Sequence, residues 1–273
     1  MGASGPTGAI FTSASIVFMK IFLIPCPIAE NTSTEVLPPQ ILTALQQTTH
    51  FLVENVRTAR RFISELKLGI QIEDLIFEIL DKDSQPKTVT DFYKKYAAVA
   101  YIGVISEAGC PGVADPGALA VSIAQQQNIE VIPLVGPSSI LLGLMGSGFS
   151  GQSFAFIGYL PIDKAARIRK IEQLDRDVAK WGQTQIFIET PYRNNALLED
   201  LIAQCAPDSL ICIACDVTAP SSFVQTKKAS DWAKAQPDLH KKPCIFLQIC
   251  PVLLGCPIYI RYPYCQKVDL ENP

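Results

Sequence analysis

The chain has 273 residues, of which 48% are apolar, so it is long enough and apolar enough to bury a conventional core. Lysine and arginine (23) almost balance aspartate and glutamate (26), and the net charge is -3. This balance excludes the domain-wide basic surface of a non-specific nucleic-acid-binding protein, so any contact with a polyanion must be local.

The start of the chain has neither a basic segment nor a persuasive cleavage site, so a secretory signal is not indicated. Met19-Lys20 directly precedes a strand-like run. We therefore expect residues 1–18 to be an extension or a disordered tail.

Short apolar runs alternate with helical patterns in the first half of the chain, and this alternation predicts a mostly parallel sheet with helices on its faces. The expected strands are KIFLIPCP (20–27), HFLVEN (50–55), YIGVIS (101–106) and IEVIPLV (129–135). The expected helices are PPQILTALQQ (38–47), VRTARRFISEL (56–66), TVTDFYKKY (88–96) and PGALAVSIAQQQ (116–127).

A second series of elements follows an uncharged stretch, and its last strands have no helix between them, so a mixed sheet is expected. Its members are FAFIGYLP (154–161), the charged helix DKAARIRKIEQLDRD (163–177), TQIFIET (184–190), YRNNALLEDLIAQ (192–204), LICIACDVT (210–218), FVQTKKAS (223–230) and PCIFLQIC (243–250). We predict two α/β domains, 19–148 and 149–250, followed by an atypical tail at 251–273.

The uncharged stretch Val131–Ile162 is interrupted by prolines and glycines, so no apolar helix of about 20 residues fits and no membrane span is expected. The nine cysteines and the lack of a secretory signal favour free thiols in a reducing cytoplasm. Cys212 and Cys215 form a C-x-x-C pair, which suits a zinc or redox site or, more simply, a buried strand. We favour the strand and expect no metal.

Four unusual loops follow expected strands, and ligands of open α/β sheets bind beyond the carboxyl ends of the strands. The loops are PCPIAEN (25–31), Glu54-Asn55, ISEAGCPGVADPG (105–117) and Gly136–Ser139. None fits a phosphate-binding motif. They offer main-chain groups, small side chains and few cations, which favours a neutral or cationic small molecule over a nucleoside triphosphate.

These loops resemble a known family. Ser106–Pro111 and Ala114–Gly117 are similar to the signature S-[DE]-A-G-x-P…D-P-G of the tetrapyrrole-methylase-like, S-adenosylmethionine-dependent methyltransferases. Further similarities follow in the family's order: Pro25-x-Pro27-Ile28, Glu54-x-x-Arg57, Pro133–Ser138, Gly158–Pro161 and Glu189–Arg193. The most similar branch methylates the ribose 2′-hydroxyl of a cytidine in small-subunit ribosomal RNA.

The resemblance implies two α/β domains with S-adenosylmethionine in the cleft between them, a homodimer, and ribosomal RNA or the small ribosomal subunit as substrate. It places cofactor contacts at Pro27, Ile28, Gly109, Cys110, Val113, Ser139, Ile140, Glu189 and Pro243. A methyl group moves by in-line displacement, so the loops mainly have to position donor and acceptor.

A ribose hydroxyl is a weak nucleophile that benefits from a general base. Glu54, Arg57 and Glu107 are the candidate catalytic residues, and Glu54 is the hypothesised base because it ends a strand without an evident structural task. Asp115 is better explained as a helix cap or loop ligand. Arg57 and Lys164, each in a basic helical cluster, are either solvated or hold RNA phosphates.

The chain departs from the family pattern at Asn55, at Cys215–Ala219 and at Lys242-Pro243, so the acceptor stays open. One alternative is methylation of a corrinoid or porphyrinoid precursor or another small molecule. Another is a homologue that keeps the cofactor-binding fold and has lost catalysis.

Overall fold

The computed structural model describes residues 19–249, which form two compact units built from interleaved segments of the chain. The first unit contains the chain up to Ile24, Pro39–Glu107 and Pro111–Leu134. The second contains Pro25–Pro38, Ala108–Cys110 and the chain from Val135. The extension expected at 1–18 and the tail expected at 251–273 lie outside the described residues.

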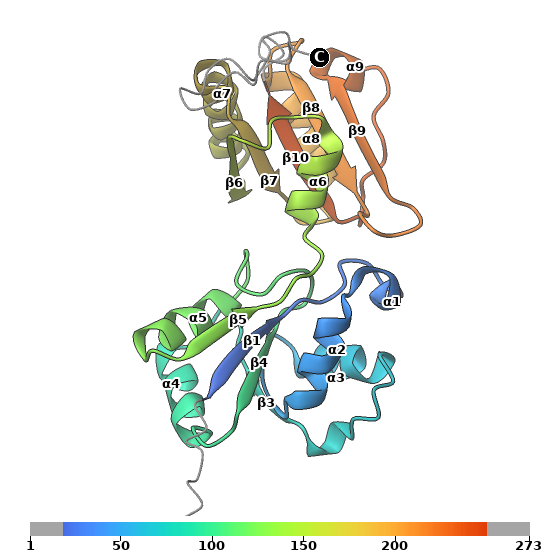
Figure 1. Cartoon of the computed structure of the whole chain (residues 1–273). Helices are drawn as coiled ribbons and strands as arrows, with labels where there is room; N and C mark the ends of the chain where they lie inside the picture. Colours follow the sequence, from blue (N-terminus) through green and yellow to red (C-terminus); the bar gives the residue numbers. More distant parts are fainter. Residues whose placement is uncertain (1–18, 250–273) are drawn as a thin grey trace, which may run out of the picture. The chain divides into compact units, whose positions relative to one another are not determined.

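The first unit contains a five-stranded, fully parallel sheet in the order β3-β2-β4-β1-β5 (Figure 1). Its strands are β1 (Lys20–Ile24), β2 (His50–Val53), β3 (Ile76–Ile79), β4 (Tyr101–Ile105) and β5 (Glu130–Pro133). The predicted parallel sheet is confirmed. The edge strand β3 was not predicted, because its four residues include the polar Glu78 and are only partly buried.

Helices cover both faces of this sheet, as the alternating sequence pattern requires. They are α2 (Pro39–Gln47), α3 (Val56–Glu65), α4 (Pro86–Lys95) and α5 (Gly117–Gln126), with the 3-10 turn η1 (Ile72–Asp74) before β3. In Figure 1, α4 and α5 lie on one side of the strands and α2 and α3 on the other. A core of apolar side chains from α4, α5 and the sheet, among them Val89, Ile102 and Ala124, fixes the strand ends that carry the loops.

The second unit contains a mixed five-stranded sheet in the order β6-β7-β10-β8-β9, with only β6 and β7 parallel. Its strands are β6 (Phe154–Tyr159), β7 (Thr184–Ile188), β8 (Leu210–Cys215), β9 (Phe223–Lys228) and β10 (Cys244–Ile249). The mixed sheet expected from the sequence is confirmed. The strand expected at 223–230 ends at Lys228, because Ala229 begins a short helix.

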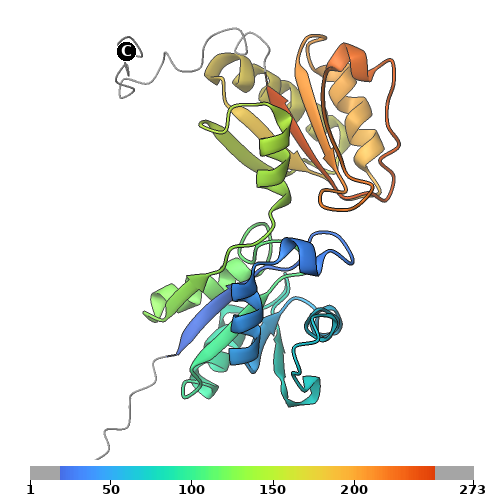
Figure 2. The ribbon, with the colours of Figure 1, turned by 45° about the vertical axis from the view of Figure 1, so that its right-hand side comes forward.

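Helix α6 (Ser139–Ser147) lies on one face of the second sheet, as Figure 2 shows, and α7 (Lys164–Trp181) and α8 (Asn194–Gln204) lie on the other. Two short helices, α1 (Ser33–Val36) and α9 (Ala229–Trp232), complete the unit. Gly143 lets α6 approach the sheet, since an added Cβ would stand 3.3 Å from Ala214 and 3.4 Å from Ile245. Gly143 and Leu144 of α6 thus pack into this core, whereas Leu141 and Met145 on the same helix are exposed.

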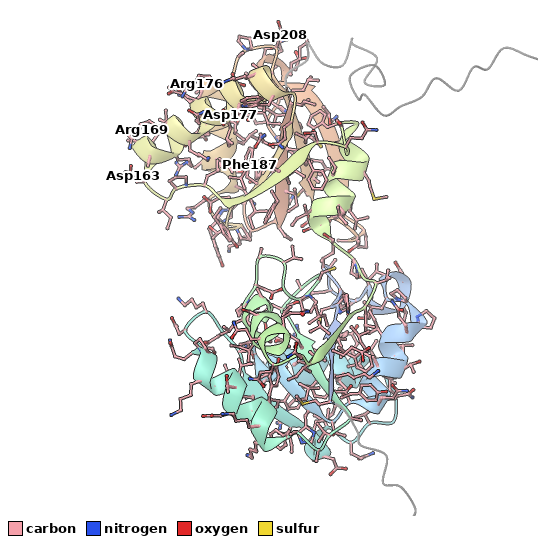
Figure 3. All side chains as sticks on the ribbon, turned by 60° about the vertical axis from the view of Figure 1, so that its left-hand side comes forward. Asp163, Arg169, Arg176, Asp177, Phe187 and Asp208 are labelled. Carbon is pink, nitrogen blue, oxygen red and sulfur yellow. The ribbon has the colours of Figure 1, made fainter. Side chains whose placement is uncertain are left out.

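Charged residues of α7 separate into an outer and an inner set. Arg169 and Arg176 are exposed on the outer side of the helix (Figure 3). The inner side of the helix faces the core of the unit, where Phe187 of β7 stacks on Phe246 of β10 with ring centroids 6.1 Å apart. Arg167, by contrast, is buried. The basic cluster predicted on this helix is therefore not one solvated face.

Cys212 and Cys215 lie three residues apart on β8, so their side chains point to opposite faces of the sheet. Both are fully buried, and burial raises the pKa of the Cys212 thiol. This confirms the buried-strand interpretation of the C-x-x-C pair. Within residues 19–249, no cluster of three or more metal-ligating side chains occurs, and no helix has the length and apolarity that a membrane span needs.

Candidate active site

The loops that follow β1 and β4 are joined by a small antiparallel bridge. The amide of Cys26 donates to the carbonyl of Gly109 at 2.9 Å, and the amide of Gly109 donates back to the carbonyl of Cys26 at 3.1 Å. Their parent strands β1 and β4 are parallel neighbours in the sheet, so the two loops leave the sheet side by side before they form this antiparallel bridge. Two loops far apart in the sequence are thereby fixed against each other.

A third loop, after β5, packs onto this bridge. The Cys110 thiol donates to the carbonyl of Pro137 at 3.4 Å, and Gly136 lies so close to Pro25 that an added Cβ would stand 2.1 Å from its Cβ. Gly109 has φ +73°, and an added Cβ would stand 3.4 Å from Ile28. Gly136 is therefore needed for the close packing against Pro25, and Gly109 is needed for the positive φ of the loop after β4, which places this loop in contact with Ile28.

The loop before α5 and the loop before α6 are each fixed by a local side-chain hydrogen bond. Asp115 accepts hydrogen bonds from the amides of Gly112 and Gly117, so it holds the turn that presents Val113, which is 50% exposed. Asp115 thus acts as a loop ligand, one of the two structural tasks expected for it. Ser138 caps α6 by accepting from the Leu141 amide. Ser139 and Ile140, like Pro27, are half-buried.

The candidate catalytic residues lie together at the carboxyl ends of β2 and β4. Asn55 caps α3 by accepting from the amides of Arg57, at 2.9 Å, and Thr58. The Thr58 hydroxyl donates to the carboxylate of Glu107, which links the loop after β4 to α3. Arg57 is exposed in the first turn of α3, with its side chain available to solvent.

Glu54 is half-buried in this cluster. Burial raises the pKa of its carboxyl group, and the negative charges of Glu107, Asp115 and Asp81 raise the pKa further, against the effect of a hydrogen bond from the backbone of Glu107. A carboxyl group whose pKa is shifted toward neutrality is a better proton acceptor at physiological pH. Glu54 therefore binds a proton more tightly than an exposed glutamate does.

Glu189 directly follows β7 and is buried. Its Oε1 accepts from the Thr190 amide at 2.6 Å and from Arg193, while Oε2 is buried without a hydrogen-bond partner within residues 19–249. Asn194 Oδ1 is likewise buried without a hydrogen-bond partner within residues 19–249, although the side-chain nitrogen of Asn194 donates to the carbonyl of Lys242 at 2.7 Å. Buried acceptors without donors are rare and costly, so these two atoms suit a ligand that brings N–H or O–H groups.

Pro243 lies at the same edge of the second sheet as Glu189, because Ile245 on β10 pairs with Ile188 on β7. Pro243 is exposed, and its carbonyl accepts from the Asp216 amide at 2.9 Å. All cofactor candidates except Val113 belong to the second unit, whereas the three catalytic candidates belong to the first.

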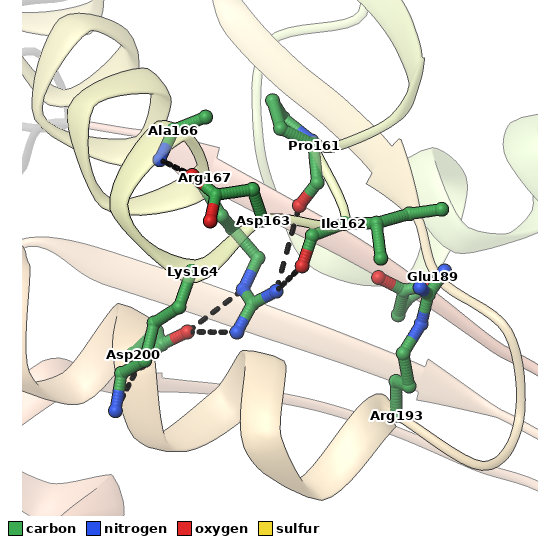
Figure 4. Close-up of polar contacts among 9 residues, drawn as sticks. All are labelled: Pro161, Ile162, Asp163, Lys164, Ala166, Arg167, Glu189, Arg193 and Asp200. Carbon is green, nitrogen blue, oxygen red and sulfur yellow. Dashed lines mark hydrogen bonds and ion pairs between the residues drawn. The ribbon is translucent and has the colours of Figure 1, made fainter.

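Sequence reasoning missed the buried pair of Arg167 and Asp200. Arg167 Nε and Nη2 each lie 2.7 Å from Asp200 Oδ2, and Nη1 donates to the carbonyl of Ile162 at 2.9 Å (Figure 4). Both residues are less than 10% exposed. The pair ties the loop after β6 to α7 and α8. Lys164 Nζ lies 3.9 Å from the same carboxylate group, but the side chain stays exposed. Lys164 can therefore contact a phosphate, whereas the buried Arg167 cannot.

The chain matches no protein-family model. It is 26% identical over 205 residues to "Ribosomal RNA small subunit methyltransferase I" of Vibrio cholerae, covering 75% of this chain and 67% of the relative. The protein of the same name from Halalkalibacterium halodurans is 26% identical, with 67% and 59% covered. A third, from Synechocystis, is 33% identical, with 45% and 43% covered. The chain thus spans less than two thirds of the latter two relatives.

Solved structures with the same fold include the methyltransferase CobJ, with a TM-score of 0.57, 18% identity, and 85% of this chain and 94% of CobJ covered. Uroporphyrin-III C-methyltransferase from Thermus thermophilus, complexed with S-adenosylhomocysteine, gives a TM-score of 0.53 at 13% identity, with 86% and 99% covered. These likenesses establish the α/β fold. Together with the curated relatives, they confirm the resemblance found in the sequence.

Proposed function

We propose that this chain, a relative of the ribosomal RNA small subunit methyltransferases I with the tetrapyrrole-methylase-like fold, methylates a ribose 2′-hydroxyl of small-subunit ribosomal RNA. The observation that carries the proposal is the joining of three loops through Cys26, Gly109 and Pro137, since these loops hold the family's sequence signature. A cytoplasmic location and a homodimer are parts of the same proposal.

S-adenosylmethionine, when bound, supplies a methyl group on a positively charged sulfur. The loop residues Ile28, Gly109 and Cys110 would hold this cofactor through backbone groups and apolar contact. Val113, in the same loop as Cys110, and Ser139 and Ile140, at the start of α6, would provide further contacts. Glu189 Oε2 would accept a hydrogen bond from one of its amine or hydroxyl groups. A rigid backbone cradle suits a reaction in which positioning supplies much of the rate.

Glu54 would accept the proton of the ribose hydroxyl as that oxygen takes the methyl group, with neutral S-adenosylhomocysteine as the leaving group. Glu54 would return the proton to solvent after the products leave. The charge of Glu107 raises the pKa of Glu54, whereas the stronger effect of the hydrogen bond from the Glu107 backbone lowers it, so burial is the main cause of the raised pKa. The hydrogen bond from Thr58 holds the Glu107 carboxylate in place. Arg57, exposed beside them, would hold an RNA phosphate and set the register of the substrate.

The test combines cofactor binding with product formation in one protein preparation. Calorimetric titration with S-adenosylmethionine and S-adenosylhomocysteine is expected to give dissociation constants on the order of micromolar. Incubation with undermethylated small ribosomal subunits and labelled cofactor is expected to place the label in RNA. Cofactor binding without RNA labelling would overturn the assigned acceptor and favour a porphyrinoid or other small molecule. An absence of cofactor binding would indicate a homologue that has lost catalysis.

Alkylation of Cys110 provides a prediction about the cofactor loops. Of the six cysteines within residues 19–249, Cys110 alone is only half-buried, so it should react first with iodoacetamide among these six. S-adenosylhomocysteine at ten times its dissociation constant should slow this reaction about tenfold, because only the unoccupied fraction reacts. Peptide mapping by mass spectrometry measures the rate at each cysteine. An unchanged Cys110 rate at that occupancy would remove the residue from the cofactor site.

A further inference from the structure

Two exposed aromatic rings are in contact beyond the end of β7. Tyr192 is 69% exposed, and its ring meets the exposed His240 edge to face, with the ring centroids 5.9 Å apart. Neither ring is part of the buried core of the second unit. Two exposed rings in contact provide a small surface on which a planar ligand can stack.

The loops that carry the two rings are clamped together. The Lys241 amide donates to the carbonyl of Pro191 at 3.0 Å. Asn195 accepts from the Leu239 amide at 2.8 Å and donates to Asp238 at 2.9 Å. These bonds hold both loops against the start of α8. The rings are therefore presented by a fixed backbone, which lowers the entropy lost when a ligand binds.

Positive charge lies beside the rings. Lys241 is exposed and follows His240 directly. The carboxylate in the same turn, Asp238, accepts from the His240 amide at 3.0 Å and from Asn195, and these bonds fix its negative charge within the clamp. Exposed Tyr159 ends the neighbouring strand β6, where it pairs with Ile188 of β7. We call Tyr192, His240 and Lys241 the Tyr192 platform.

We propose that the Tyr192 platform binds unpaired nucleotides of RNA, with a base stacked on Tyr192 and a phosphate held by Lys241. Aromatic rings combined with nearby cations are the means by which proteins bind single-stranded nucleic acid, since every base has a face that stacks. A stable protein interface would instead bury a larger area than these three side chains offer. The inference rests on the proposed function, because it supplies a binding surface for the RNA substrate.

The experiment measures binding of a fluorescently labelled, unstructured RNA oligonucleotide to the full chain by fluorescence anisotropy. Tyr192→Ala should weaken binding by about 5- to 150-fold, the loss expected for one stacked base, whereas Tyr192→Phe should bind nearly as well as the parent protein. Trp181→Ala is the matched control: Trp181 is 67% exposed and has Lys180 4.5 Å from its ring, but it lies at the end of α7. That control should bind RNA normally.

Lys241→Ala should reduce the slope of log affinity against log salt concentration by about 0.7, the value for one phosphate contact to a single strand. Equal RNA affinity of Tyr192→Ala and the parent protein would overturn the inference, as would an equal loss in the Trp181→Ala control. Cofactor titration and RNA labelling separate this failure from failure of the proposed function. If labelling occurs but Tyr192→Ala binds normally, only the platform is wrong; if the platform binds RNA and no label is transferred, only the proposed activity is wrong.

Discussion

Replacement of Glu54 by glutamine is expected to lower the rate of methyl transfer by about 10²- to 10⁴-fold, the usual contribution of a general base. Glutamine keeps the size and polarity of the side chain but cannot accept the proton. The dissociation constant of S-adenosylmethionine should stay unchanged, because Glu54 is assigned to the acceptor. Single-turnover labelling of undermethylated small subunits at saturating cofactor measures this effect.

The carboxylate of Glu78 supplies a matched control. It is also half-buried and lies on β3, the strand next to β2 in the same sheet. Glu78→Gln removes a similar charge at a similar depth and should leave the rate nearly unchanged. Normal turnover of Glu54→Gln would show that the proton leaves by another route, and equal losses in both variants would indicate a general effect of charge.

The pKa of Glu54 makes the variant informative about stability as well. Because folding raises this pKa, the folded protein holds the proton more tightly than the unfolded chain. Ionisation of Glu54 therefore lowers the free energy of unfolding. This loss of stability develops as the pH rises from the ordinary pKa of glutamate to the raised pKa of Glu54 in the folded protein. Denaturant unfolding of Glu54→Gln should show a stability relative to the parent protein that increases over this pH range and is constant below it.

The strand ends that carry the candidate site could be predicted because local patterns identify them. Apolar runs followed by glycine and proline indicated the loops after β1, β4 and β5, and the rule for parallel sheets placed those loops at one edge. The bridge between Cys26 and Gly109 agrees with that expectation. Glu54 could be singled out from its position at the end of a strand, but the carboxylates that raise its pKa come from distant segments.

Residues whose environment depends on tertiary partners escaped prediction. Arg167 stands in a helix rich in charge, where sequence alone favours exposure, and only the fold brings Asp200 to it from 33 positions away. Helix α6 has no charged residue in Ser139–Ser147, so its sequence lacks the polar face that would reveal an amphipathic helix. The periodicity of apolar residues alone therefore cannot identify buried charged residues or helices that are apolar on most sides.

Replacement of Asp200 by asparagine should lower the free energy of unfolding by about 3–5 kcal/mol, the usual cost of breaking a buried ion pair from one side. The guanidinium group of Arg167 would keep its hydrogen bonds to the carbonyls of Pro161 and Ile162 but would remain buried without a counter-charge. Guanidinium chloride unfolding measures the loss. The double change Arg167→Met with Asp200→Leu should recover most of it, since a buried pair is often replaceable by apolar side chains.

The exposed ion pair of Lys228 and Asp208 is the control for this test, because it distinguishes the effect of burial from the effect of ion pairing. Its N···O distance of 2.7 Å equals that of the buried pair, yet its side chains are 49% and 73% exposed. Asp208→Asn should leave stability almost unchanged, because water solvates the lysine that remains and screens the lost attraction. If Asp200→Asn were equally mild, the guanidinium group of Arg167 would have to reach water, and the loop after β6 that it holds would have to move.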